Sequence, residues 1–171
     1  MDNQQERLDK VYLACAIECE GHISLQYGRK TYNKDNGDLA IQILPRVGFT
    51  NKDDLLTEKV VRISKAHNIG CHVGKDCRNN GCKQTLWNGM KRVKSLLEFI
   101  LPELLAKKER AEIVLEFINS RLSSPNIHEP YSLKEWFLFR EIRMKNGKGR
   151  NTQIDEKISR ILRDYMPDAQ K

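Results

Sequence analysis

The feature that most constrains the fold is a change of hydrophobic period after Glu20. From Gln5 to Glu20 apolar side chains recur at helical spacing, and Leu13 and Ile17 form a second stripe beside the first. Between His22 and Phe49 apolar and polar side chains alternate instead, as they do in antiparallel strands. We therefore expect a helix that buries two faces, followed by a long β-hairpin.

The predicted hairpin has one apolar side and one polar side. Its turn, Lys30 to Asp38, is longer than a tight hairpin requires, and long hairpin tips often touch ligands. With the apolar side toward a core, the other face presents mainly polar and basic side chains. This face carries Ser24, Gln26, Lys30, Tyr32, Lys34, Gln42 and Arg46.

The rest of the chain predicts a helix, a weaker hairpin and then further helices. The expected bounds are Lys52 to Ala66 for the helix, Gly70 to Lys75 and Lys83 to Trp87 for the strands, and Lys91 to Ile100, Leu104 to Leu122, Leu133 to Met144 and Asp155 to Tyr165 for the later helices. The fold class is α+β. We expect one domain over 1–171, with an αββαββα core in 1–122 and C-terminal helices in 123–171.

Composition narrows the class of protein. The chain holds 30 Lys and Arg against 23 Asp and Glu, a net charge of +7, which suits a polyanionic partner without proving one. No apolar run is long enough to span a bilayer, so no membrane partner is expected. An odd number of cysteines favours reduced thiols in an intracellular protein, in an organelle or a prokaryotic cytoplasm. Cys71, His72, Cys77 and Cys82 are candidate zinc ligands, but they do not form the two C-x₂₋₄-C knuckles of common structural zinc sites, so zinc is disfavoured.

The string from Leu13 to Gly21, LACAIECEG, resembles the LAGLIDADG motif of homing endonucleases. The resemblance implies a helix that packs against its counterpart and an antiparallel sheet that forms a DNA-binding saddle. It also implies that Glu20 and Gly21 bind a divalent cation, Mg²⁺ or Mn²⁺. Cys15 replaces the usual Gly and Ala16 a larger apolar residue. Without the motif, Glu20 is simply a water-exposed carboxylate at a helix end.

A single motif implies a homodimer, because single-motif members of this family pair whereas double-motif members act alone. Small side chains let two helices approach closely. The interface expected on the motif helix consists of Leu8, Tyr12, Cys15, Ala16 and Cys19.

Two later residues match family positions next to the metal. Asn51 follows the first hairpin, where a polar side chain helps to position solvent, and Lys107 lies near the start of a late helix, where a lysine points into the active site. Both have structural alternatives. Asn51 is also a favourable helix N-cap, and a lysine at a helix start is commonly just solvated. We predict that Glu20, Asn51 and Lys107 are catalytic.

The resemblance implies a site-specific homing endonuclease, encoded in an intron, that hydrolyses both strands of a long, partly palindromic DNA site and leaves short 3′ overhangs. Gln and Arg or Lys on a ribbon in the major groove pair with adenine and guanine. The alternative is an intron maturase, an RNA-splicing cofactor with the same fold. Further DNA contacts are expected on the second hairpin, although a solvated polar face explains them almost as well: His72, Lys75, Arg78, Lys83 and Thr85.

Overall fold

A computed structural model describes residues 3–31, 39–75, 81–125, 130–147, 156 and 158–160, and gives no side-chain detail for 29–31 and 39–41. Its elements are α1 (Asn3–Glu20), β1 (Gly21–Thr31), β2 (Leu39–Asn51), α2 (Asp54–Ala66), β3 (His72–Lys75), β4 (Lys83–Asn88), α3 (Met90–Ile100), η1 (Leu101–Glu103), α4 (Lys108–Ser123) and α5 (Leu133–Lys145). One four-stranded antiparallel sheet has the order β1-β2-β4-β3. The predicted α+β class and the αββαββα order are confirmed.

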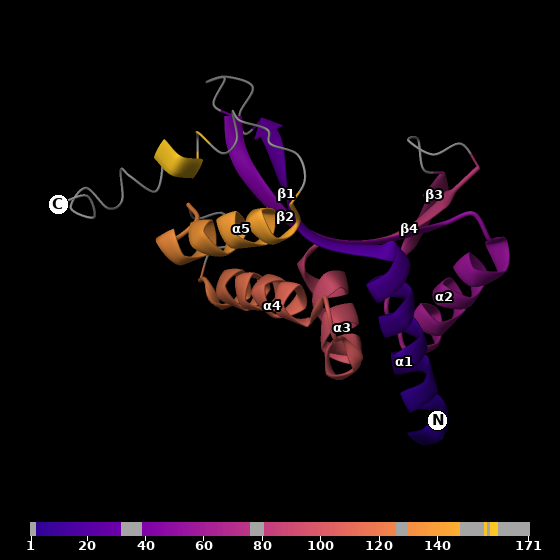
Figure 1. Ribbon diagram of the computed structural model, residues 1–171. Coiled ribbons are helices and arrows are strands. Elements are labelled where there is room, and N and C mark those ends of the chain that lie inside the picture. Colours follow the sequence, from indigo (N-terminus) through magenta and orange to yellow (C-terminus); the bar gives the residue numbers. More distant parts are fainter. Residues whose placement is uncertain are drawn as a thin grey trace.

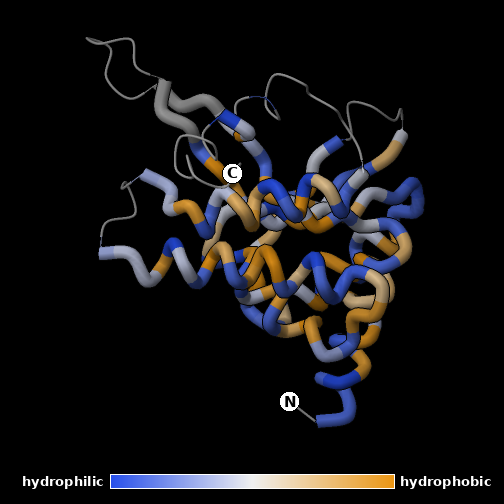
Figure 2. The backbone as a smooth tube through the Cα atoms, turned by 60° about the vertical axis from the view of Figure 1, so that its left-hand side comes forward, coloured by the Kyte–Doolittle hydropathy of each residue, from blue (hydrophilic) through white to orange (hydrophobic). Residues whose placement is uncertain are grey.

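The labelled helices lie on one side of the sheet and leave its other side uncovered (Figure 1). The core forms between them, and the hydrophobic segments gather in the body of the molecule where the helices pack (Figure 2). Trp87 of β4, Leu97 of α3 and Phe117 of α4 are fully buried in this core. Each such side chain contributes about 1.5–3 kcal/mol through burial. The two layers therefore follow from the two hydrophobic periods of the sequence.

No loop separates α1 from β1. The helix ends at Glu20 and the strand begins at Gly21. A Cβ on Gly21 would lie 2.7 Å from both the Cα and the carbonyl oxygen of Ile17 and 3.0 Å from the carbonyl oxygen of Gly48. These are backbone atoms, which cannot move aside as the end of a side chain can. Only glycine therefore fits at this junction.

The inward face of α1 is the one that the sequence predicts. Leu13 and Ile17 are fully buried. A polar tie also holds the first half of this helix, because Asp9, largely buried, lies 2.9 Å from Nε2 of His67 at the end of α2. The side-chain amide of Gln5 donates to the other oxygen of Asp9 at 2.8 Å. Apolar packing and this polar cluster together fix the direction of α1.

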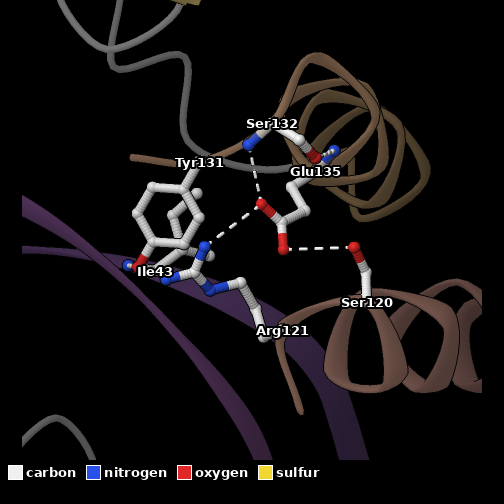
Figure 3. Close-up of polar contacts among 6 residues, drawn as sticks. All are labelled: Ile43, Ser120, Arg121, Tyr131, Ser132 and Glu135. Atoms are coloured by element: carbon white, nitrogen blue, oxygen red, sulfur yellow. Dashed lines mark hydrogen bonds and ion pairs between the residues drawn. The ribbon is translucent and has the colours of Figure 1, made fainter. Parts of the chain in front are cut away.

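A buried network joins α4, α5 and β2 (Figure 3). Arg121 of α4 pairs with Glu135 of α5 at 3.3 Å, and both side chains are almost fully buried. The Ser132 amide and the Ser120 hydroxyl donate to the same carboxylate at 2.7 and 3.2 Å. Tyr131 lies over the Arg121 guanidinium, and its hydroxyl accepts from the amide of Ile43 in β2 at 2.7 Å. The network therefore holds α5 beside the long hairpin.

Several predicted boundaries require correction. The late helix expected from Leu104 begins at Lys108, because Pro102 lies in the short 3-10 turn η1 and the chain is extended at Leu104. The helix expected from Lys52 begins at Asp54. The first hairpin strand continues to Thr31, past the predicted start of the turn.

Of the last predicted helix, 155–165, the structure describes only residues 156 and 158–160, which are helical. Within the described part of the chain, no helix has the length and apolarity needed to cross a membrane.

Candidate active site and nucleic-acid interface

The two acids at the end of the motif have different surroundings. Glu18 is engaged, because one of its oxygens accepts the backbone N–H groups of Leu105 and Lys107, both at 2.9 Å. Glu20, the last residue of α1, is exposed. Its carboxylate accepts no hydrogen bond from the residues that the structure describes. Glu18 therefore attaches the segment before α4 to the motif, and Glu20 is available to a ligand.

Lys107 closes the C-terminal end of α1. Its ammonium donates to the carbonyl oxygens of Ile17 at 2.7 Å, Glu18 at 2.6 Å and Gly21 at 2.8 Å. A cation is favourable at this end of a helix. Burial lowers the pKa of Lys107, although the Glu18 and Glu20 carboxylates oppose this effect. Lys107 therefore lies at the motif, as the resemblance implies, but all three of its donors are used on the backbone.

Asn51 is the last residue of β2. It lies at the end of the sheet next to the C-terminus of α1, since Gly21 pairs with Phe49 in the ladder. Its side-chain oxygen accepts from the amide of Asp53 at 2.7 Å. The N-cap alternative for Asn51 is wrong, because the N-cap of α2 is Asp53. Asn51 supports the turn before the cap. The sheet and the bonds of Lys107 to α1 therefore bring all three predicted catalytic residues to the junction of α1 with β1.

One chain offers an incomplete set of metal ligands. No group of three or more His, Cys, Asp or Glu side chains clusters within the described ranges. The Gly21 carbonyl oxygen, predicted to bind metal with Glu20, already accepts from Lys107. The Glu20 carboxylate suits a hard cation, which prefers oxygen ligands. Such a site needs additional oxygens from a partner or a substrate.

The uncovered face of the sheet is polar at its centre. Four of the side chains predicted for this face, Ser24, Gln26, Gln42 and Arg46, lie on it by strand alternation, opposite the buried Ile23 and its neighbours. Arg46 donates to Gln26 across the β1–β2 pair at 2.9 Å. The strand pairings place on this face residues that sequence reasoning missed: His22, Leu44, Thr50, Gln84, Leu86 and Asn88.

In the second hairpin, part of the predicted contact set lies on the side that faces the helices. Thr85 is fully buried between the sheet and the helices, so the prediction that it contacts DNA is wrong. Lys83 and Lys75 share its side, and Lys83 pairs with Asp54 of α2 at 2.8 Å. His72 lies on the uncovered face as expected, paired with Leu86.

Trp87 is the sequence signal that could have predicted which side of β4 faces the core. A large aromatic side chain is expected to be buried, and alternation then places Thr85 and Lys83 on the same side. Tyr32, Lys34 and Arg78 lie outside the described residues, and no side-chain detail is given for Lys30.

An apolar stripe runs along the outer side of α1. Leu8 is 57% exposed and Val11 38%, and the Cys15 and Cys19 thiols are exposed on the same side. Tyr12 and Ala16, also expected at the interface, pack partly against the chain's own core. The Lys59 ammonium also lies 3.9 Å from the centre of the Tyr12 ring. We call Leu8, Val11, Cys15 and Cys19 the α1 stripe.

Known structures with the same arrangement are homing endonucleases. I-CvuI, solved in complex with the I-CreI target, has a TM-score of 0.71 and 18% identity over 95% of this chain and 97% of its own. The archaeal intron-encoded I-Vdi141I, complexed with DNA, has a TM-score of 0.66 and 18% identity over 84% and 87% of the two chains. The chain has the LAGLIDADG homing endonuclease fold.

The likeness to the homing endonuclease fold extends to a third structure. I-TnaI has a TM-score of 0.63 and 16% identity over 91% of this chain and 96% of its own. No protein-family model matches the sequence, and no curated protein matches it significantly. At such identities the likeness is one of fold. Within this fold, the junction and the uncovered sheet face are the candidate site.

Proposed function

We propose that the protein is a site-specific homing endonuclease that binds a long, partly palindromic double-stranded DNA site as a homodimer. It hydrolyses both strands with a divalent metal and leaves short 3′ overhangs. The observation that carries this proposal is the exposed Glu20 carboxylate at the point where the motif helix becomes the first strand of the uncovered sheet. A group able to hold a metal thus adjoins a surface able to read DNA.

The chemistry requires little else from the chain. Mg²⁺ or Mn²⁺ held by Glu20 would lower the pKa of a bound water and stabilise charge on the leaving oxygen. Lys107 keeps the carbonyl end of α1 in place and thereby positions Glu20 beside it. Asn51, at the same end of the sheet, has an amide nitrogen that can donate to solvent.

The α1 stripe supports the homodimer. Large apolar side chains left in water along one helix face mark a surface that another molecule covers. Leu105, 86% exposed, extends this surface beyond the end of α1, because its amide is bonded to Glu18. Two copies related by a twofold axis through α1 would bring two Glu20 carboxylates together, one for each strand of the duplex.

The substrate proposal is supported by charge and by the fold. The chain carries a net charge of +7, and the uncovered face presents amide and guanidinium groups of the kind that pair with base edges. I-CvuI has been solved with DNA in the presence of Mg and in the presence of Ca. A divalent cation and duplex DNA are therefore the first ligands to test.

The test requires a candidate target, which the rejoined flanks of an enclosing intron or intein would supply. We expect Glu20→Gln to abolish Mg²⁺-dependent cleavage of this DNA while site binding changes little, because the substitution removes the metal's carboxylate and keeps the side chain's shape. Glu112→Gln, on an exposed turn of α4, is the matched control and should cut like the wild type.

Two results would overturn the proposal. A Glu20→Gln enzyme that cuts at the wild-type rate contradicts the role of this carboxylate. A wild-type protein that cuts no DNA but promotes splicing of the host intron RNA in vitro is a maturase, the alternative function for the same fold.

A further inference from the structure

His22 occupies an unusual position on the uncovered face. It is the first side chain of β1 on that face, two residues after Glu20, and it pairs across the strands with Gly48 of β2. A Cβ built on Gly48 would lie 2.1 Å from Cε1 of the His22 ring, and 2.8 and 2.9 Å from its two nitrogens. The imidazole therefore fills the space where any other residue at position 48 would place its side chain.

This pair forms one end of a row that crosses the whole sheet. The ladder continues from Gly48 to Leu86 of β4 and from Leu86 to His72 of β3. Lys and Arg are absent from this row, whereas the next row contains Arg46, paired with Ser24. The ring lies over the one position in the row without a side chain. The middle of this face thus presents an imidazole beside an apolar leucine.

We propose that His22 is a specificity-determining residue whose imidazole, held across Gly48, donates a hydrogen bond to N7 of a purine close to the cleaved phosphates. The inference rests on the proposed endonuclease function. Because His22 directly follows the motif, it lies nearer to α1, and so to the twofold axis of the dimer, than any other side chain of β1 on this face. It reads the innermost part of each half-site.

A base edge suits this position better than a phosphate. The phosphate backbone is usually gripped by Lys, Arg and backbone N–H groups, and the row offers neither of those side chains. Each imidazole carries at least one N–H donor, and both purines present the N7 acceptor in the major groove. The neighbouring Leu86 side chain suits the C5 methyl of a thymine.

The first experiment measures base preference. Sites are selected from randomised duplex DNA by the wild-type dimer and by His22→Ala, and thermal unfolding verifies that both proteins fold. We expect the variant to lose the preference for a purine at one symmetric pair of positions nearest the cleavage sites, and to keep the others. Uniform weakening at all positions would indicate a phosphate contact and overturn the proposal.

The second experiment removes the acceptor. A 7-deazapurine at the assigned position replaces N7 with C–H and leaves Watson–Crick pairing intact. We expect about three- to tenfold weaker binding by the wild type, the effect of one lost hydrogen bond, and no change for His22→Ala. The same replacement at the other purines of the site is the control. Equal losses for the wild type and the variant would contradict a contact from His22.

The third experiment tests the role of the glycine. Gly48→Ala should displace the ring and reproduce the altered preference of His22→Ala, whereas adding Gly48→Ala to His22→Ala should change nothing further, because the clashing ring is gone. Additive losses would show that position 48 acts independently.

Failure of this inference is distinguishable from failure of the function. A wild type that neither selects a site nor cuts DNA defeats the endonuclease proposal. A wild type that does both, with unchanged preferences in His22→Ala, defeats only the role of His22.

Discussion

Lys107 shows how much a single side chain contributes to the structure of this site. Its three donated bonds end on carbonyls of α1 and on the first residue of β1. The last carbonyls of a helix have no partners within the helix. A lysine from a distant segment supplies those partners here, and it does so beside Glu20.

We expect Lys107→Met to destabilise the protein by about 2 kcal/mol, because partly buried carbonyls lose charge-assisted hydrogen bonds. Cleavage should fall further than stability explains, since the end of α1 carries Glu20. Urea unfolding and single-turnover cleavage measure the two effects. Lys108→Met is the control, because Lys108 is exposed at the first position of α4. Equal stability of the two variants would show that the bonds to α1 contribute nothing.

Gly21→Ala should destabilise the fold by about 1–3 kcal/mol, the usual effect of forcing atoms into a filled space. Its Cβ would meet the backbone of Ile17 at 2.7 Å. Gly28→Ala on the same strand is the matched comparison, because its nearest atom, the carbonyl oxygen of Gln42, is 3.7 Å away. Thermal unfolding of both variants measures this destabilisation. A Gly21→Ala variant that melts no lower than Gly28→Ala would show that position 21 tolerates a side chain.

The sequence predicts these residues better than it predicts their bonds. Resemblance places Glu20, Asn51 and Lys107 at matching positions, and the structure brings all three to the same end of the sheet. The partners of Lys107 could not be predicted, because they depend on the path of Leu104 to Lys107 after the η1 turn. That path is set by Glu18, which binds the amides of this segment.

At the scale of elements, the first hairpin was predictable and the second was not. β1 and β2 are 11 and 13 residues long, and Ile23, Leu25, Ile43, Val47 and Phe49 recur on one side of them, so the buried side is unambiguous. β3 has only four residues, HVGK, and its one large apolar side chain, Val73, is 39% exposed. A one-residue shift moves every side chain to the other face. Lys75, Lys83 and Thr85 were therefore assigned to the wrong side.

The buried network of Figure 3 gives a prediction for the packing of α5. Glu135→Gln should cost about 3 kcal/mol, because Arg121 would keep a buried charge without its counterion. Glu141→Gln on the same helix is the control, since its pairing with Lys145 is half exposed and 3.9 Å long. Such surface pairs contribute at most about 1 kcal/mol. Chemical denaturation that finds the two variants alike would exclude a structural role for the buried pair.

At the scale of the whole molecule, the main expectation concerns assembly. Cys15→Glu would place a charge in the middle of the α1 stripe, and we expect it to yield a folded monomer where the wild type is a dimer. Sedimentation equilibrium at several concentrations measures the mass. Leu122→Glu, at an exposed apolar position near the end of α4, should remain dimeric.

A Cys15→Glu protein that sediments as the wild type does would remove α1 from the interface. The same variant links assembly to cutting. If two Glu20 carboxylates are required, a folded monomer should lose double-strand cleavage even though its own Glu20 is intact.

The direct passage from α1 into β1 has a consequence for how such a protein can acquire a new target. In the proposed enzyme, the carboxylate that holds the metal and the strand that reads DNA are consecutive in the chain, with no intervening residue to absorb a change in either. Substitutions close to Gly21 are therefore expected to displace both the Glu20 carboxylate and the first DNA contacts of β1. Drift toward new DNA sequences should begin at the far end of the hairpin and reach His22 last.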